Sequence, residues 1–512
     1  MGIPNLERES LSEDVRAYIA ELEQEVFLLK ERLDLLLYKR FERSSERNLT
    51  NEQQELPFAE EAESEETQIP ADTNENEKQE VKSYARKKPG RKPIDDALPR
   101  QELLVDIPED EKTCACGASL TRIGEETSEK LEIIPPSMYV LRTVRPKYAC
   151  RSCEGTEDEE EPAVRMAPVP PTIIPRSIAS ASLLSYILIQ KYQDHLPFYR
   201  QEKQFQRIGV QISRQDMSNW QRQAYDRLEP LFDLMKRTLK SGPVMRMDET
   251  TTQVMGEEGR TDTQKSYMWL ARGGPPGKTV AWYEYHPTRG HEHAKAMLEG
   301  FSGHLQTDGY EGYDKAVAGR EDIVHVGCFA HARRKFFEAS KVTKTPQSAE
   351  EGLKYIRKLY ELEEELRKKN LEDGDFLAQR KEQAEPILAA FRGWLEKRVD
   401  AVPPSVLLGQ AIRYTLNQWD KLVAYLESPY LTPDNNLSEN AIRPFVLGRK
   451  NWLFNKSPEG AESSCGIYSL IETAKQNGVE PLLYLRKLFE ECPKAESPGD
   501  WEKLLPWNMF TA

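Results

Sequence analysis

Three acidic residues, Asp248, Asp308 and Glu439, stand where the chain could bring carboxylates together for metal-dependent chemistry. Asp248 and Asp308 each follow a short strand-like stretch, and Glu439 lies on a predicted helix that Asp434 would cap. Carboxylates from two strands and a later helix can hold two divalent cations about 3.5–4 Å apart for phosphoryl transfer. Mg²⁺ and Mn²⁺ prefer oxygen ligands, so these residues are candidate metal ligands. Taken singly, an aspartate after a strand is more often a turn residue or helix cap.

The elements that must position these residues begin near residue 243. Short strands are predicted at 244–247, 266–271, 279–285, 304–307 and 322–327, with helices at 291–301 and 330–339. The first strand is expected to stop at Asp248. Three antiparallel-style strands followed by strand–helix alternation predict a mixed α/β sheet. A Glu-, Lys- and Leu-rich helical block, roughly 350–426, is typical of an insertion between this sheet and the helix of Glu439.

An apolar pattern near the N-terminus recurs every 3.5 residues, which predicts a left-handed coiled coil. The residues at these positions are Val15, Ile19, Leu22, Val26, Leu29, Leu33 and Leu36. A helical hairpin within one chain is the alternative, and self-association is the preferred interpretation.

The formal net charge of −14 is concentrated in two acidic segments, 51–80 and 154–161, so it does not exclude a nucleic-acid partner. The stretch 44–80 has no periodicity and predicts a disordered linker. A basic segment follows, in which Pro and Gly favour an extended backbone that could follow phosphates or enter a minor groove. A solvated linker is an equal alternative. The basic residues of this segment are Arg86, Lys87, Lys88, Arg91 and Lys92.

Two close cysteine pairs, Cys114 with Cys116 and Cys150 with Cys153, predict a structural zinc site. Four thiolates can bind Zn²⁺ tetrahedrally, and a small module with little core of its own gains stability from the metal. A strand-like stretch, 131–144, separates the pairs. Free thiols are the alternative, because a disulfide framework is not expected in a cytoplasmic chain with seven cysteines.

Between the zinc module and the sheet, the stretches 183–189, 201–208 and 213–228 predict helices. The segment 209–220 has the turn and N-cap chemistry of a helix-turn-helix, with Ser213 as the cap. The helices could contact DNA in this way, or they could form a packing unit only.

Ordered motifs extend over nearly the whole chain. They are 145–150, Met247-Asp248-Glu249-Thr250, Gln306-Thr307-Asp308-Gly309-Tyr310, Cys328-Phe329-Ala330-His331-Ala332-Arg333-Arg334, 434–452, 468–475 and 504–508. In these motifs the chain resembles the transposases of the bacterial insertion sequence 66 family, which are of the Asp-Asp-Glu type with a ribonuclease-H-like core. Two departures are Phe41-Glu42, where Phe-Gly is common, and the tight spacing of Cys114 and Cys116.

The resemblance implies catalysis by Asp248, Asp308 and Glu439 with two Mg²⁺ or Mn²⁺ ions, and a structural Zn²⁺. The expected division is a coiled-coil segment (1–43), an acidic linker ending in the basic segment (44–93), a zinc-binding module (94–168), a helical domain (169–242), a ribonuclease-H-like core (243–348 and 431–475) with a helical insertion (349–430), and a C-terminal segment (476–512).

Further residues near the motifs are candidates for supporting roles. His325, Cys328 and His331 have a spacing that suits a metal, although a core or supporting role for His331 is the preferred interpretation. Basic side chains near these motifs are expected to contact DNA, with Arg333 and Arg334 contacting its backbone. They are Arg333, Arg334, Arg443, Arg449 and Lys450.

The expected function is a transposase that binds double-stranded DNA at the element ends and the target, cleaves the ends and joins the 3′-hydroxyls. A homo-oligomer and small accessory proteins of the same element are expected partners. The alternatives are a nuclease of the same fold without strand transfer, and a catalytically silent DNA-binding protein. No apolar run is long enough for a membrane span and no signal peptide is evident, so the expected location is the cytoplasm.

Overall fold

The computed structural model describes residues 13–41, 164–342 and 346–510, together with 100–104, 137–149 and isolated positions between 104 and 137. These residues belong to two units, one made of 169–510 with the N-terminal helix, and one of the residues from 100 to 168. The basic segment 86–92 and all four predicted zinc ligands lie outside the described residues, so the predictions for them stay predictions.

The smaller unit contains a two-stranded antiparallel ribbon. β1 (Lys147–Ala149) pairs with β2 (Val164–Met166), and Tyr148 lies opposite Arg165. Nη1 of Arg145 donates a hydrogen bond to the carbonyl of Ala167 at 2.9 Å and so extends the ribbon. The strand-like stretch predicted at 131–144 is wrong for its described residues, because none of them pairs in a ladder and a strand needs a partner.

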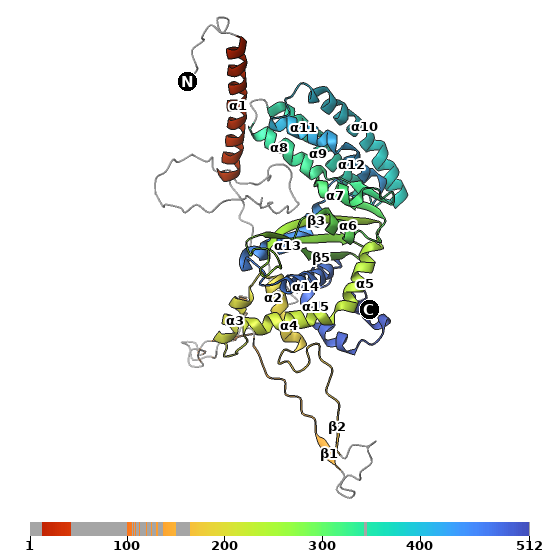
Figure 1. Ribbon diagram of the computed structural model, residues 1–512. Helices are drawn as coiled ribbons and strands as arrows, with labels where there is room; N and C mark the ends of the chain where they lie inside the picture. The colour runs from red at the N-terminus through yellow and green to blue at the C-terminus, as the bar shows by residue number, and fades with distance from the viewer. Residues whose placement is uncertain are drawn as a thin grey trace. The chain divides into compact units, whose positions relative to one another are not determined.

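A five-stranded mixed sheet is the centre of the larger unit (Figure 1). Its strand order is β5-β4-β3-β6-β7. The strands are β3 (Val244–Gln253), β4 (Lys265–Gly273), β5 (Val280–His286), β6 (Gly303–Gln306) and β7 (Ile323–Val326). β3, β4 and β5 are antiparallel neighbours, while β6 and β7 run parallel to β3. The predicted mixed α/β class is confirmed.

The strand β3 is longer than predicted. We expected it to stop at Asp248, but it continues to Gln253 because this second half pairs antiparallel with β4, where Thr250 lies opposite Met268. Three successive threonines, 250–252, favour the extended backbone. Asp248 therefore lies inside a strand, at the level where the parallel pairing of β3 with β6 has just ended.

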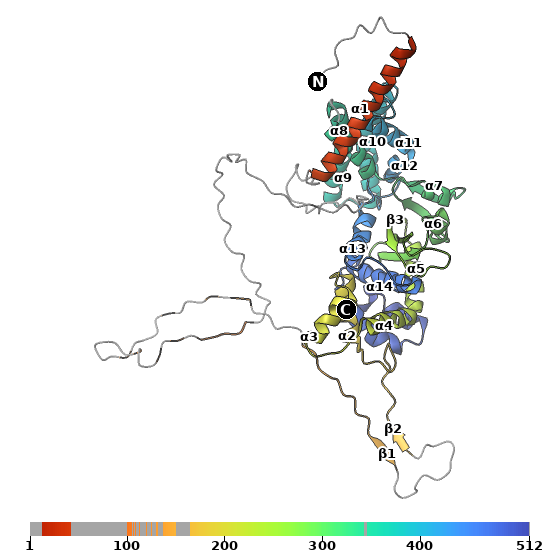
Figure 2. The same cartoon turned by 60° about the vertical axis from the view of Figure 1, so that its left-hand side comes forward.

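Helices cover the sheet in two groups. The first group is α2 (Ala181–Tyr192), α3 (Phe198–Arg207), α4 (Arg214–Arg227), α5 (Glu229–Lys240), α14 (Pro458–Gln476), α15 (Pro481–Glu491), η4 (Cys492–Lys494), α16 (Pro498–Lys503) and α17 (Pro506–Met509). The second is α8 (Phe329–Val342), α9 (Pro346–Lys368), α10 (Asp373–Val399), α11 (Leu407–Asn417), α12 (Trp419–Val423) and η3 (Ala424–Glu427). Figures 1 and 2 show the two groups on opposite sides of the sheet. Each group has its own hydrophobic core.

Three further helices lie close to the strand ends. They are α6 (His291–Met297), α7 (Glu311–Val317) and α13 (Asn436–Trp452). The predicted helix 291–301 ends early, at Met297, and Gly300 follows with φ +75°, a conformation that glycine adopts without steric cost.

The buried helix α14 protects the edge strand β5. An edge strand exposes unpaired backbone N–H groups, which are a site for unwanted strand pairing. Here Ser469 Oγ accepts a hydrogen bond from Tyr283 N at 2.9 Å, and Thr473 Oγ1 accepts one from Ala281 N at 3.1 Å. The side-chain hydroxyls of α14 thus substitute for a sixth strand and fix this helix against the sheet.

A buried arginine fixes the end of the second helical group. Arg380 on α10 donates to Glu363 Oε1 at 2.7 Å and to the carbonyls of Tyr425, Ser428 and Leu431 at 2.9–3.0 Å. These carbonyls lie on the segment that leads from η3 into α13. The position of α13 therefore depends on packing within the helical group.

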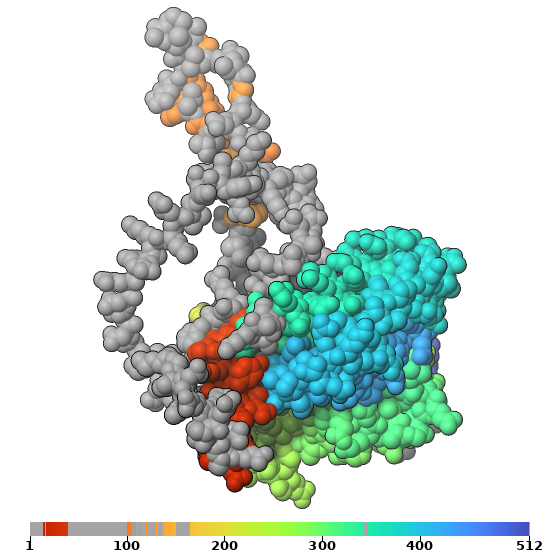
Figure 3. Space-filling view, turned by 90° about the horizontal axis from the view of Figure 1, so that it is seen from above, coloured from red at the N-terminus to blue at the C-terminus, as the bar shows by residue number. Residues whose placement is uncertain are grey.

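The N-terminal helix α1 (Glu13–Phe41) lies against the second helical group (Figure 3). The buried Glu31 accepts a hydrogen bond from Leu407 N at 3.3 Å, and the ring of Tyr38 contacts that of Phe337. Six of the seven predicted heptad residues are exposed, and Ile19 is half-buried. The apolar stripe thus remains available for the predicted self-association. Among the described residues, no helix is both long and apolar enough to cross a bilayer.

Candidate active site

The parallel pairing of β3 with β6 brings Asp248 and Asp308 to the same level. Arg246 lies opposite Gln306 in the parallel register, and each aspartate follows two residues later. Asp248 continues β3, whereas Asp308 stands just after β6. Both carboxylates therefore lie at the edge where the two parallel strands stop pairing.

A buried polar bridge below these carboxylates ties the sheet to the segment before α13. Nε of Arg246 donates to Gln306 Oε1 at 3.0 Å, and Nη2 donates to the carbonyl of Tyr430 at 2.7 Å. Nε2 of Gln306 donates to the carbonyl of Thr432 at 2.7 Å. The buried amide and guanidinium thus satisfy each other and hold the chain that leads to Glu439.

Glu439 reaches the same edge from the first turn of α13. Nδ2 of Asn435, which is 2 % exposed, donates to the carbonyl of Met247 at 3.0 Å. The backbone N–H of Phe329 donates to Pro433 at 2.9 Å. These bonds fix the start of α13 beside β3, one residue from Asp248. The structure therefore brings Asp248, Asp308 and Glu439 together from three separate segments.

The N-cap of α13 differs from the prediction. We expected Asp434 to cap this helix, but the N-cap is Asn435 and the helix begins at Asn436. The carboxylate of Asp434 instead accepts from the backbone N and side-chain Nδ2 of Asn436, at 3.2 and 2.8 Å. Since Asn435 must point its amide at β3, its neighbour Asp434 satisfies the first N–H of the helix.

The clustered carboxylates are electrostatically strained. Desolvation, together with the charges of Glu249, Glu439 and Asp308, raises the pKa of Asp248 well above its usual value. Desolvation raises the pKa of Glu439 to about 7, while Arg334 opposes this shift and Asp434 and Asp308 add to it. Bound cations would remove the repulsion between these groups.

Glu249 on β3 belongs to a network of side chains that leads to Asp308. Its carboxylate accepts hydrogen bonds from Tyr313 Oη and from Arg289 Nε, the latter at 2.6 Å. The guanidinium of Arg289 lies 3.9 Å from the ring centroid of Tyr310, whose N–H donates to Asp308 Oδ1 at 3.0 Å. No sequence pattern predicted this network. The strand alternation indicates only that Glu249 turns away from Asp248.

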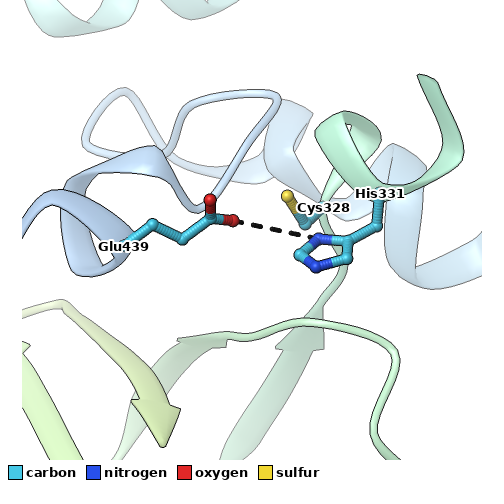
Figure 4. A group of neighbouring side chains, drawn as sticks. All are labelled: Cys328, His331 and Glu439. Atoms are coloured by element: carbon cyan, nitrogen blue, oxygen red, sulfur yellow. Dashed lines mark ion pairs between the residues drawn. The ribbon is translucent and has the colours of Figure 1, made fainter. Parts of the chain in front are cut away.

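A second cluster adjoins Glu439 and is shown in Figure 4. The thiol sulfur of Cys328, a ring nitrogen of His331 and a carboxylate oxygen of Glu439 all lie within 4.8 Å of one another. Nδ1 of His331 is 3.9 Å from Oε1 of Glu439. The remaining residue of the predicted trio, His325, is not part of it, because its ring bonds to Asp314 at 2.9 Å and to Thr307 at 2.8 Å.

Family comparisons decide the relationship of this chain. The Transposase IS66 family matches residues 176–463, more than half of the chain. The chain belongs to this family. The predicted resemblance is thus confirmed, and all three carboxylates fall within the matched range. The IS66 C-terminal element matches 469–507, the zinc-finger binding domain of transposase IS66 matches 111–154, and the Transposase C of IS166 homeodomain matches 28–103.

Relatives of this IS66-family chain occur in Sinorhizobium fredii. The uncharacterized protein y4qI is 33% identical over 449 residues, which cover 84% of this chain and 81% of the relative. The uncharacterized protein y4jD is 31% identical over 423 residues, which cover 80% of each chain.

The zinc-finger match includes all four predicted zinc cysteines and so supports zinc binding by this segment.

The predicted DNA contacts of this IS66-family chain occupy different environments. Arg334 and Lys450 are exposed, whereas Arg333 and Arg443 are half-buried. Arg449 donates to Thr250 Oγ1 at 3.3 Å and Thr251 Oγ1 at 2.9 Å, and so fixes the end of α13 against β3. Arg449 therefore has a structural role, and its contact with DNA, like that of the other four, stays a prediction.

Proposed function

We propose that this chain is an Asp-Asp-Glu transposase that cleaves the ends of an insertion sequence and joins the 3′-hydroxyls to target DNA. Two observations carry the proposal. Asp248 in β3 and Asp308 just after β6 follow paired residues of the parallel register, and the charges of Asp308 and of Glu439 in α13 help to raise the pKa of Asp248. Membership of a transposase family supports the substrate class.

The donor set fits two divalent cations. Carboxylate oxygens suit Mg²⁺ or Mn²⁺, and Oε1 of Glu439 is buried without a hydrogen-bond partner among the described residues. When bound, the cations would lower the pKa of the attacking hydroxyl and stabilise the leaving oxygen. Asn435 and Arg449 hold α13 against β3 and so orient Glu439. The Arg246–Gln306 bridge keeps the two strands in register beneath Asp248 and Asp308.

A ribonuclease-H-like core is part of the proposal. Three antiparallel strands followed by two strands parallel to the first, in the order β5-β4-β3-β6-β7, support this fold. Asp248 lies on the middle strand of this order. The residues 346–427 would then be a helical insertion between β7 and α13. The helix that carries Glu439 would follow this insertion in the sequence.

DNA binding would use several surfaces. The helices α3 and α4 are joined by a short turn with Gly209 at φ +81°, and the predicted N-cap Ser213 is confirmed. One face of α4 packs inward through Trp220 and Gln221, and the opposite face is polar and exposed. This arrangement supports a helix-turn-helix. The zinc-binding module and the basic segment 86–92 are further proposed contacts.

The decisive experiment is cleavage of DNA that carries the inverted repeats flanking the gene. We expect Asp248→Asn to abolish Mg²⁺-dependent strand cleavage while end binding, measured by mobility shift, is retained. The matched control is Asp233→Asn, which changes an exposed aspartate on α5. Cleavage by the Asp248 variant at the wild-type rate would remove this residue from the proposed site.

Two other functions are distinguished by the same substrates. A nuclease without strand transfer would cleave the ends but would not join pre-cut 3′-hydroxyl ends to a plasmid. A catalytically silent DNA-binding protein would bind the ends and show no cleavage with Mg²⁺ or Mn²⁺. A requirement for an accessory protein can be tested by adding that protein to the strand-transfer reaction. The oligomeric state can be tested by measuring the mass of the protein in solution.

A further inference from the structure

The cluster of Cys328, His331 and Glu439 has the chemistry of a metal site distinct from the proposed pair of cations. Cys328 immediately precedes α8, and His331 lies three residues later, so both face the same side of this helix. Glu439 approaches from α13. Figure 4 shows the thiol and the imidazole directed toward the carboxylate.

Two atoms of this cluster lack hydrogen-bond partners. Nδ1 of His331 and Oε1 of Glu439 are buried and form no hydrogen bond with any residue that the structure describes. Their separation of 3.9 Å is too long for a hydrogen bond. Buried polar atoms without partners are rare in native proteins, because each has lost its contact with water. A buried ring nitrogen and a buried carboxylate oxygen without hydrogen bonds, beside a thiol, are therefore suited to bind a cation together.

We propose that Cys328, His331 and Glu439 bind a thiophilic divalent cation such as Zn²⁺, and that this cation competes with the catalytic pair for Glu439. The competition rests on the proposed function, whereas the binding does not. Thiolate, imidazole and carboxylate are the usual ligands of zinc, and a fourth position would remain for water. A sulfur ligand favours Zn²⁺ over Mg²⁺.

The geometry is close to that of a bound site. Tetrahedral zinc places such ligand atoms about 3.3–3.6 Å apart, given bond lengths of about 2.0–2.3 Å. The three ligand atoms lie within 4.8 Å of one another, so they must approach by about 1 Å. Rotation about the side-chain bonds of Glu439 can supply this movement. As the metal–sulfur bond forms, the Cys328 thiol loses its proton to solvent.

The backbone around the cluster is already fixed without a metal. Sγ of Cys328 accepts a hydrogen bond from Asn435 N at 3.2 Å, and Phe329 N donates to the carbonyl of Pro433. These bonds join the start of α8 to the start of α13. The metal therefore does not have to order these segments, and a pre-organised site binds more tightly.

Charge balance explains why the two sites exclude each other. One thiolate and one carboxylate neutralise a divalent cation, which makes its burial favourable. Glu439 supplies that carboxylate, and it is then no longer available to bind the catalytic cations together with Asp248 and Asp308. Zinc at the cluster would thus weaken the binding of the cations needed for cleavage.

Metal binding can be measured on the full chain without DNA. We expect wild-type protein to bind one more equivalent of Co²⁺ or Zn²⁺ than Cys328→Ala, with the corresponding loss of cobalt–thiolate absorption in the near ultraviolet. Cys492→Ala is the matched control, because Cys492 is an equally buried free thiol elsewhere in the fold. The proposed zinc module is common to all three proteins, so only the difference in metal content is informative. Equal metal content in the wild type and Cys328→Ala would overturn the proposal.

A second variant tests the same site if the first variant does not fold. If Cys328→Ala loses its thermal transition, His331→Gln is used in its place, with the same expected loss of one equivalent. The competition is tested by adding Zn²⁺ to the Mg²⁺-dependent cleavage reaction. We expect inhibition that excess Mg²⁺ relieves, and at least about tenfold more Zn²⁺ required with Cys328→Ala. Equal inhibition of both proteins would refute the competition. A chain without cleavage activity would contradict the proposed function and leave the metal-content result intact.

Discussion

The amide of Asn435 should control the position of Glu439. Asn435→Ala removes the hydrogen bond to the carbonyl of Met247, which is 3.0 Å long and buried. A buried carbonyl left without its donor costs about 1–3 kcal/mol. The carbonyl belongs to the residue before Asp248, so α13 would loosen at the point where two of the three carboxylates meet.

Asn435→Ala should lower the rate of catalysis as well as the stability. A displacement of about 1 Å in a catalytic group lowers the rate by about 10²-fold, because the reacting atoms lose their alignment. We therefore expect single-turnover cleavage by Asn435→Ala to fall by about 10²-fold, a higher Mg²⁺ concentration for half-maximal rate, and unchanged affinity for end DNA. Denaturant unfolding should show a loss of about 1–3 kcal/mol.

A matched control lies on the same helix. Asn451 is an asparagine near the C-terminal end of α13, and its amide donates to the carbonyl of Leu447 within that helix at 3.2 Å. Asn451→Ala should cleave DNA at the wild-type rate. The reasoning is refuted if Asn435→Ala also cleaves at that rate, since the bond to β3 would then play no part in positioning Glu439.

Three further changes test other parts of the structure. Arg380→Met should destabilise the protein by about 1–3 kcal/mol in denaturant unfolding, because the buried carbonyls of Tyr425 and Ser428 would lose the guanidinium that donates to them, whereas Glu363 keeps its ion pair with Arg367. An unchanged free energy of unfolding would contradict this. Burial lowers the pKa of Lys191 to about 7 from 10.5. The unfolded chain therefore binds more protons between these values, and the stability of the wild type should rise with pH across this window relative to Lys191→Met. A constant difference between the two proteins from pH 7 to 10 would contradict this. Replacing the exposed Leu29 and Leu33 by serine should lower the mass measured by light scattering without changing the melting of the sheet core, and an unchanged mass would exclude association through α1.

Local patterns predicted much of the sheet and its helices. All five strands of the core lie where alternating and β-branched residues indicated, and Ser213 caps α4 as its side chain suggests. The errors occur where a partner outside the local sequence decides the outcome. β3 continues past Asp248 because β4 lies beside it, and α13 begins after Asn435, whose amide bonds to β3, instead of directly after Asp434.

The sequence by itself determined which residues could act together and to which family the chain belongs. Motif order identified Asp248, Asp308 and Glu439, since those residue types and their neighbours are visible without coordinates. Tertiary structure alone decided that Glu439 lies against Cys328 and His331, that His325 turns to Asp314, and that Glu249 pairs with Arg289. These contacts join segments far apart in the chain. They depend on how buried polar groups find partners after packing, which no local periodicity encodes.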